Sequence, residues 1–316
     1  MKIIKILTFT LMFGFLTSQS SFAKTCTESD IRAALSKGKA FIYKQEGCTN
    51  TDGIIAIKKG IAVGKSGWLF DGGDLAKLLW KGAGACDKKS RTSEYAFFGV
   101  NASNVTLKNF IAHGAPEGIH ISTGNNNTIE NATFTEICEK AIRNGNKASN
   151  AAKNTLVINS KFYVNKGPAD HVILVQGGSI RVESSYFKGK TNSIAACAEN
   201  PDPGDHGKVP CKVPSKITAV GNTIDGCSGY GMRSAGKGPA RGGYLIAEGN
   251  TFRNCHTPLQ VEEEGHVEAR GNSFNSCSQA LRTTTSQATG VYGCGNKSTC
   301  KETSGSGIKR ETNCNL

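Results

Sequence analysis

Ionisable side chains of opposite charge are concentrated in three short segments near the middle of the chain. The members of this set are Glu117, His120, Glu139, Lys140, Arg143, Lys166, Asp170 and His171. Carboxylates held close together can bind a hard cation such as calcium, and a neutral imidazole can accept a proton from a bound substrate. Either chemistry requires a fold that brings segments distant in sequence side by side.

An internal repeat predicts such a fold. Segments with similar sequences begin at Asn104, Asn127, Asn154, Ser179, Lys216, Tyr244 and His266. Each contains a short stretch of alternating apolar and polar residues, a turn, and a second short apolar stretch. The alternation has a period of two, unlike helical repeats, and no ladder of leucines runs through it. The sequence therefore predicts an all-β, right-handed, single-stranded parallel β-helix in which each repeat forms one coil.

Two columns of inward-facing apolar residues align the predicted coils. The first column is Phe110, Phe134, Phe162, Phe187, Ile224, Phe252 and Phe274. The second column is Ile119, Ile142, Val172, Ile194, Met232, Leu259 and Leu281. The residues two positions before the second column are Glu117, Lys140, Asp170 and Asn192. The alignment thus predicts a corner column of acid, lysine and acid, which Glu139 and His171 adjoin. His120 and Arg143 are expected on the outward face beside it.

Two interpretations of this cluster remain open from the residues alone. Glu117, Glu139 and Asp170 could together hold calcium, which prefers several carboxylate oxygens. Alternatively, Lys140 neutralises the acids above and below it, and the cluster is a charged ladder with neither metal nor activity.

The corners and ends of the predicted β-helix have their own signals. Gly-Asn-Thr/Ser-apolar tetrads begin at Gly221, Gly249 and Gly271, and suit tight corners because Gly and Asn tolerate left-handed backbone. Residues 27–38 predict a short capped helix that closes the N-terminal end. We expect a signal peptide over residues 1–23, the β-helix with its N-terminal cap over 24–285, and a cysteine-containing tail or cap over 286–316.

All twelve cysteines follow the signal segment, and an even number in an exported chain favours disulfides. Expected local pairs are Cys26 with Cys48, Cys197 with Cys211, and Cys294 with Cys300. Cys227, Cys255 and Cys277 are expected to form a column, either as stacked thiols or with neighbours bridged. We expect the mature protein to be secreted or periplasmic, without a membrane-spanning segment, and monomeric.

The formal net charge of +13 favours an anionic partner. Nucleic acid is not expected, because aromatic residues are only 7% of the chain and no basic stacking platform is evident. An acidic polysaccharide such as polygalacturonate is the expected partner.

The motifs EGIH, ICEKAI and ADHV, on successive coils, resemble those of the pectate lyase superfamily. Family 3 of the polysaccharide lyases is the most similar, with DGVH, then VxEDAL, then a YDKV-like strand. This resemblance implies that Glu117 and Glu139 bind calcium and that His171 is the base. Calcium would bridge the substrate carboxylate, and the glycosidic bond would break by β-elimination.

The chain departs from that family at several positions. Lys140 stands where the family has its third acid, Glu117 replaces an aspartate, and His171 replaces a lysine. The family's further basic residues are missing from residues 191–196, so Arg143, Arg233 or Arg282 would have to serve, and only Arg143 is on an adjacent coil. Lys140 could replace calcium as the cation that neutralises the substrate.

We therefore expect a lyase that cleaves a uronate polysaccharide. His171, Lys140 and Arg143 would be catalytic, while His120, Lys166 and Arg233 would bind substrate. A non-catalytic β-helix that binds carbohydrate, as an adhesin does, is the alternative. A hydrolase would need paired carboxylates flanking the scissile bond. Glu117 with Asp170, or Asp202 with Asp205, could supply them.

Overall fold

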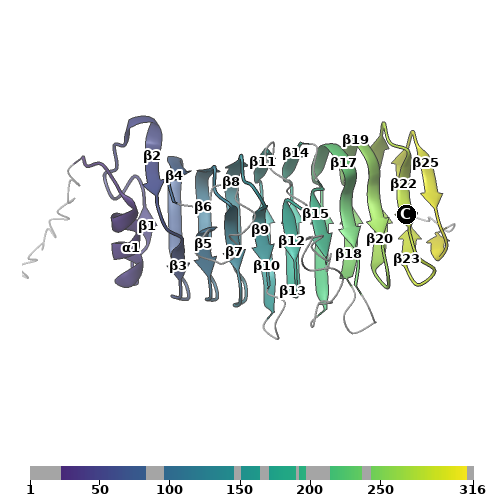
Figure 1. Ribbon diagram of the computed structural model, residues 1–316, viewed down its shortest axis with the longest axis horizontal. Helices are drawn as coiled ribbons and strands as arrows, with labels where there is room; N and C mark the ends of the chain where they lie inside the picture. The colour runs from purple at the N-terminus through teal and green to yellow at the C-terminus, as the bar shows by residue number, and fades with distance from the viewer. Residues whose placement is uncertain are drawn as a thin grey trace, which may run out of the picture.

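The chain forms a right-handed parallel β-helix of about nine turns. The computed structural model describes residues 23–82, 96–145, 151–163, 171–189, 192–196, 214–236 and 243–311. Successive coils lie side by side along the axis, from the N-terminal helix α1 (Glu28–Ser36) to the C-terminal strands (Figure 1). Every strand pair within the described residues is parallel, as the period-two repeat predicts.

Each coil contributes to three walls. The first wall consists of β1 (Phe41–Ile42), the first halves of β4 (Leu69–Trp80), β6 (Thr106–His113) and β8 (Thr128–Thr135), then β10 (Ala152–Ile158), β13 (Gly178–Glu183), β16 (Ser215–Val220), β18 (Gly243–Glu248), β20 (His266–Arg270), β23 (Thr289–Tyr292) and β26 (Ile308–Arg310). The second wall consists of β2 (Ile54–Ile57), the second halves of β4, β6 and β8, then β11 (Lys161–Tyr163), β14 (Tyr186–Lys188), the first halves of β17 (Thr223–Ser234) and β19 (Thr251–Val261), β21 (Ser273–Asn275) and β24 (Lys297–Ser298).

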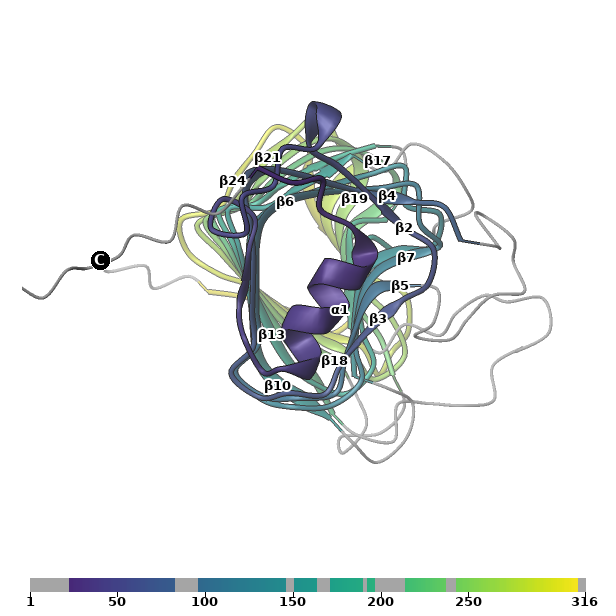
Figure 2. The same ribbon diagram turned by 90° about the vertical axis from the view of Figure 1, so that its left-hand side faces the viewer.

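The third wall carries the candidate site. It consists of β3 (Ile61–Val63), β5 (Ala96–Val100), β7 (Glu117–Ile121), β9 (Lys140–Asn144), β12 (Ile173–Val175), β15 (Ile194–Ala196), the second halves of β17 and β19, β22 (Gln279–Thr283) and β25 (Lys301–Ser304). Viewed along the axis, β5 and β7 lie to the right of the outline, and β10 and β13 lie to the lower left (Figure 2). The first and third walls therefore present separate faces to the outside.

Aromatic side chains stack along the axis inside the second wall. The ring centroids of Phe134 and Phe162 are 5.2 Å apart, and those of Phe162 and Phe187 are 4.6 Å apart. The predicted column is correct from Phe134 onward but wrong at Phe110, which pairs with Ala132. Ala112 and Phe110 both point inward because the alternation has a period of two. The aromatic type of Phe110 therefore suggested a register that is two residues off.

The corner prediction is confirmed for the Gly-Asn tetrads. Gly221, Gly249 and Gly271 have φ angles of 63°, 61° and 63°, in the left-handed region where glycine is favoured. The asparagines that follow are buried and bond along the axis. The Asn222 Nδ2 donates to Asn250 Oδ1 at 2.9 Å, and the Asn250 Nδ2 donates to Asn272 Oδ1 at 3.0 Å.

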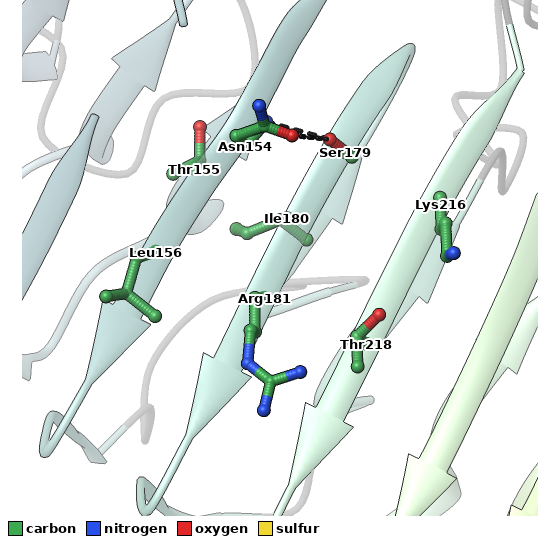
Figure 3. Close-up of a pocket in the computed structure, with 8 residues that line it drawn as sticks. All are labelled: Asn154, Thr155, Leu156, Ser179, Ile180, Arg181, Lys216 and Thr218. Carbon is green, nitrogen blue, oxygen red and sulfur yellow. Dashed lines mark hydrogen bonds between the residues drawn. The ribbon is translucent and has the colours of Figure 1, made fainter. Parts of the chain in front are cut away.

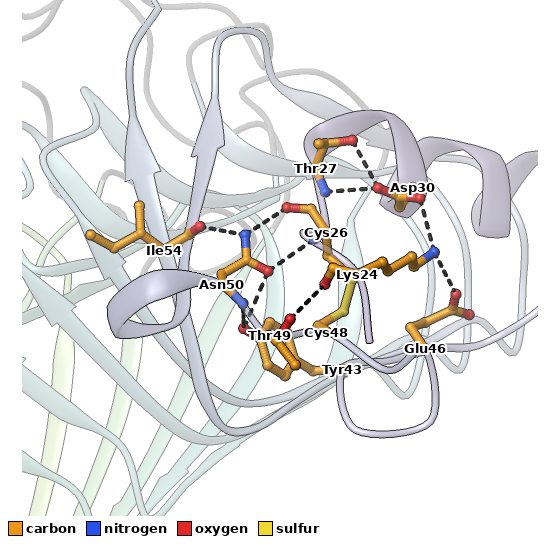
Figure 4. The surroundings of a disulfide bond; sticks show 10 residues. All are labelled: Lys24, Cys26, Thr27, Asp30, Tyr43, Glu46, Cys48, Thr49, Asn50 and Ile54. Carbon is orange, nitrogen blue, oxygen red and sulfur yellow. Dashed lines mark hydrogen bonds and ion pairs between the residues drawn. A yellow bond between two sulfur atoms is a disulfide. The ribbon is translucent and has the colours of Figure 1, made fainter. Parts of the chain in front are cut away.

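The predicted N-terminal cap is also confirmed. Asp30 accepts hydrogen bonds from the backbone N–H and the hydroxyl of Thr27, at 2.7 and 2.8 Å, and so fixes the first turn of α1. The helix lies across the open end of the coils (Figure 2) and buries Ile31 and Leu35 against them. The expected disulfide between Cys26 and Cys48 ties this cap to the following chain (Figure 4).

Two other disulfides join cysteines on neighbouring coils, and not cysteines that are close together in the sequence. Cys227 is bonded to Cys255 and Cys277 to Cys300, in each case between neighbouring coils. The expected pair of Cys294 with Cys300 is therefore wrong, because Cys300 lies 5.4 Å from Cys277 in Cα separation, one coil away. Cys294 is disulfide-bonded as well. The expected pair of Cys197 with Cys211 lies outside the described residues.

The ends of the chain show two further features. Strands β23 to β26, within the segment expected as a tail, continue the parallel coils as far as Arg310. Nearly all of the expected signal segment lies outside the described residues. Within the described part of the chain, no helix has the length and apolar character that crossing a membrane requires.

Candidate functional site

The register of the third wall decides which side chains meet at the predicted corner. Ile142 pairs with Ile173, and Ile173 pairs with Ile194. The predicted alignment on Val172 is therefore wrong by one residue. Val172 and Ile173 are both buried in the core, because the chain turns inward for two successive residues at this corner. Ala141 and Ile142 do the same one coil earlier, so apolar character alone cannot select the register.

The corner column is consequently acid, lysine and histidine rather than acid, lysine and acid. Glu117 pairs directly with Lys140. The residue two positions before Ile173 is His171, and not Asp170 as expected. Asp170 and Lys166 lie outside the described residues, as do Asp202 and Asp205. The same position is occupied by Asn192 and then by Tyr230 on the following coils. We call Glu117, Lys140, His171, Asn192 and Tyr230 the corner column.

The ionisable members of this column are buried although they point away from the core. Glu117, Lys140 and His171 are 0%, 2% and 1% exposed. Leu174 and Ala195, on the same outward face, form a small apolar cluster of their own. Burial of charged groups is unfavourable unless each finds a partner, and such clusters are common at functional sites.

Glu117 is held by a cation from the next coil. The Arg143 Nη2 lies 2.5 Å from the Glu117 Oε1, and the His120 Nδ1 lies 3.6 Å from the Glu117 Oε2. Burial lowers the pKa of His120 to about 3, and the positive charges of Arg143 and Lys140 contribute. His120 is therefore neutral near pH 7, so its contact with Glu117 is not an ion pair and the charge on Glu117 is balanced by Arg143.

The second acid is also beside a cation. The Lys140 Nζ lies 3.6 Å from the Glu139 Oε2, and both side chains are largely buried. Lys140 thus contacts the acid next to it in sequence, and Arg143 contacts Glu117. Each of the two described acids assigned to calcium by the family resemblance has a basic side chain next to it.

The calcium prediction stays a prediction. A calcium ion takes six to eight oxygen ligands, usually including several carboxylates. Within the described residues, no group of three or more acidic, histidine or cysteine side chains could hold a metal ion. Asp170, the third acid expected to bind calcium, lies outside those residues.

A chain of polar contacts runs from His171 to the later coils. The Tyr230 hydroxyl lies 3.1 Å from the His171 Nδ1, although the two residues are 59 positions apart in sequence. The Arg233 Nη1 donates to the Tyr230 hydroxyl at 3.2 Å, and the guanidinium lies 5.4 Å from the centre of the same ring. Arg233 also forms an ion pair with Glu262. His171 and Arg233, both expected at the site, are therefore joined through Tyr230.

The sequence analysis missed Tyr230 as a site residue. A usable signal was present, since Tyr230 precedes Met232 by two residues, and the predicted place of Met232 is confirmed by its pairing with Ile194. Tyr230 lies in β17, beyond the coils that carry the family motifs, so those motifs give no indication of it.

Comparison with known proteins gives a likeness of fold. No protein-family model matches the chain, and no curated protein sequence matches it. Among solved structures, the chain is similar to an alginate lyase from Paenibacillus sp. str. FPU-7, with a TM-score of 0.49 and 11% identity, over 90% of this chain and 98% of that one. The specific resemblance to family 3 of the polysaccharide lyases remains a prediction.

Proposed function

We propose that the protein is a secreted polysaccharide lyase that cleaves an acidic, uronate-containing polysaccharide by β-elimination. The observation that carries this proposal is the contact of His171 with the Tyr230 hydroxyl, which also accepts a hydrogen bond from Arg233. His171 and Tyr230 lie in the same column as Lys140. These residues supply a candidate base, a hydroxyl and two cations within one cluster. β-Elimination next to a carboxylate needs these groups: a base, a proton donor, and positive charge for the carboxylate.

The proposed reaction has two proton transfers, one from the substrate carbon to His171 and one from Tyr230 to the leaving oxygen. The His171 Nε2 takes the proton from the carbon next to the uronate carboxylate, while its Nδ1–H donates to the Tyr230 oxygen and fixes the tautomer. The electrons of the broken C–H bond form the new C=C bond, and the glycosidic C–O bond breaks. The leaving oxygen takes the proton of the Tyr230 hydroxyl, and Arg233 stabilises the resulting phenolate.

Cationic side chains would make the carbon acidic. Lys140 and Arg143 are the cations that would face the substrate carboxylate and neutralise it, in the role that calcium has in the resembling family. Glu117 and Glu139 would then be positioning residues that orient these cations rather than metal ligands. His120, neutral at pH 7, could donate or accept a hydrogen bond with a sugar hydroxyl.

A non-catalytic saccharide-binding protein is the second candidate. The observation that favours it is the pairing of both described acids, Glu117 with Arg143 and Glu139 with Lys140. Acids that are already paired are suited to binding or to structural support. In this case, the buried cluster would order the outer face of the third wall and leave the sugar chain intact.

An absorbance assay separates the two candidates. The purified mature protein is incubated with polygalacturonate and with a panel of other acidic polysaccharides, and the absorbance of unsaturated uronate ends is followed with calcium or with EDTA. We expect absorbance that persists in EDTA, because Lys140 and Arg143 already lie beside Glu139 and Glu117. Loss of the absorbance in EDTA would show instead that the reaction requires a metal ion. Binding without absorbance would support the second candidate.

Lys140 provides the matching variant test. Lys140→Met keeps the length of the side chain but removes its charge, and should lower kcat at least 100-fold in EDTA, since the carboxylate would lose its neutralising cation. Lys140→Arg keeps the charge and should retain much of the rate. Unchanged elimination by Lys140→Met, with a folded protein by circular dichroism, would rule out Lys140 as the built-in cation.

A further inference from the structure

A cavity with both polar and apolar lining lies on the first wall, away from the corner column. It has a volume of about 350 Å³ and is formed by three consecutive coils, β10, β13 and β16 (Figure 3). Cavities of this size accommodate small ligands or single units of a polymer. None of the residues assigned to the lyase site contributes to it.

Two cations from adjacent strands line this cavity. Arg181 belongs to β13, and 49% of its side chain is exposed; Lys216 belongs to β16 and is also exposed. Ser179 pairs with Lys216, and Arg181 pairs with Thr218, so the cations are diagonal neighbours on strands about 4.8 Å apart. Both are long, exposed side chains on one face of the wall, so each can turn toward a carboxylate bound above Ser179 and Thr218.

The contacts of these cations leave them available to a ligand. Arg181 uses its Nε to pair with Glu183 on the same strand, and no other hydrogen bond of its guanidinium occurs among the described residues. The Lys216 ammonium lies 5.7 Å from the centre of the Tyr244 ring, a cation–π contact that holds it on this wall. That contact leaves the three N–H donors of the ammonium able to bond to oxygen.

The remaining lining suits a sugar. Asn154 and Ser179 are joined by hydrogen bonds of 2.8 and 3.3 Å, and Thr218 adds another hydroxyl on the third coil (Figure 3). These groups can bond to sugar hydroxyls, while the half-buried Leu156 offers an apolar contact to the ring. Stacking of nucleobases is disfavoured, because the nearest ring, Tyr244, already stacks against His266 at 4.8 Å.

We propose that this cavity, formed by Asn154, Leu156, Ser179, Arg181, Lys216 and Thr218, is a second binding site for an acidic saccharide. A uronate carboxylate lies between Arg181 and Lys216, and the sugar hydroxyls contact Asn154, Ser179 and Thr218. The site binds the polymer without cleaving it. It does not depend on elimination at the corner column, since it lies on a different wall and shares no residue with it.

Isothermal titration with tetragalacturonate at low salt tests the site. The variant Arg181→Gln/Lys216→Gln should bind about 5- to 10-fold more weakly than the parent, as expected for two partly exposed ion pairs. The matched control Lys161→Gln/Lys188→Gln removes two exposed lysines from the second wall of the same coils. It should bind as the parent does. All proteins carry His171→Ala, so that the saccharide stays intact whether or not the parent is a lyase.

Cross-linking locates the bound saccharide directly. A carbodiimide joins tetragalacturonate carboxylates to nearby lysine amines, and peptide mapping should show Lys216 labelled several-fold more than Lys161 and Lys188. Equal labelling of the three lysines, equal loss of affinity in both double variants, or tighter binding of an oligothymidylate would each overturn the proposal. The assay of unsaturated ends is separate, so failure of one proposal leaves the other standing.

Discussion

At the scale of single residues, the two histidines of the site have different surroundings. His120 is buried beside Arg143 and Lys140, which together with burial lower its pKa to about 3, so it is a weak base. His171 instead contacts the hydroxyl of Tyr230. A general base must take up a proton at the working pH, which the low pKa of His120 opposes. His171 is therefore the candidate to remove the proton because of its position beside Tyr230, with His120 left as a neutral polar contact.

Replacing His171 tests that assignment. His171→Ala should lower kcat for elimination by about 100- to 10,000-fold, the usual contribution of a general base. Tyr230→Phe keeps the ring but removes the hydroxyl, and should lower kcat with little change in KM. The measurement is the initial rate of absorbance on polygalacturonate.

A third histidine provides the control for these variants. His266 lies in β20 on the first wall, away from the corner column, and its Nδ1 contacts the Thr289 hydroxyl at 2.8 Å. His266→Ala should keep the parent's rate. Comparable rates for His171→Ala and the parent would remove His171 from the mechanism, whatever the result for Tyr230.

The low pKa of His120 makes a prediction about stability. In the unfolded chain this imidazole binds a proton near pH 6.5, whereas in the folded protein it does so only near pH 3. The unfolded state therefore gains protons first as the pH falls. The free energy of unfolding should decrease by roughly 1.4 kcal/mol per pH unit between these values from this group.

Urea unfolding at several pH values between 4 and 7 measures this slope. His120→Asn, which cannot titrate, should flatten the slope by about that amount. The same slope in His120→Asn and in the parent would mean that other groups cause the acid sensitivity.

At the scale of elements, the corners fix the coils to one another. Asn250 is fully buried and makes several bonds along the axis. Its amide donates to the carbonyl of Ala219 at 2.9 Å and to Asn272, and its Oδ1 accepts from the backbone and side chain of Asn222. Loss of such a side chain leaves buried donors and acceptors without partners, which costs more than the bonds themselves contribute.

Asn250→Ala should therefore lower the free energy of unfolding by roughly 2 to 4 kcal/mol. The control is Asn275→Ala. The Asn275 side chain lies on the next coil and donates a hydrogen bond to Ser273, so its loss should lower the free energy of unfolding by less than about 1 kcal/mol. Chemical denaturation of the two variants provides the comparison. Equal costs would show that the ladder of asparagines does not hold these corners.

At the scale of the whole molecule, each coil packs only on its neighbours, and the two end coils carry the exposed edges. The N-terminal edge is covered by α1, which the Cys26–Cys48 disulfide holds in place (Figure 4). The Cys277–Cys300 disulfide joins coils near the other end. An uncovered edge of parallel strands pairs readily with another chain, so the N-terminal cap protects against aggregation as well as unfolding.

Removing the N-terminal disulfide should separate these effects. Cys26→Ala/Cys48→Ala should lower the free energy of unfolding by about 3 kcal/mol, as for a loop of similar length, and should increase light scattering on warming. Cys277→Ala/Cys300→Ala, with nearly the same sequence separation, is the control and should cost a similar amount without uncovering the N-terminal edge. Equal scattering of the two variants would contradict the role of α1 as an edge cover.

The sequence by itself determined the fold and much of the inward-facing pattern. Few folds other than a parallel β-helix are compatible with a repeat in which apolar and polar residues alternate with a period of two. The Gly-Asn corners, the helix after Thr27 and the Cys26–Cys48 bond were also predictable, because each depends on local backbone chemistry or on a short separation.

Only the tertiary structure decided the register and the partners within the site. At the corners two successive side chains point inward, so apolar character allowed Val172 where the pairing requires Ile173. This shift of the register by one residue places His171, and not Asp170, in the corner column. The contacts of Glu117 with Arg143 and of His171 with Tyr230 join different coils. Such contacts depend on the stacking of the coils and on burial, neither of which a one-dimensional pattern contains.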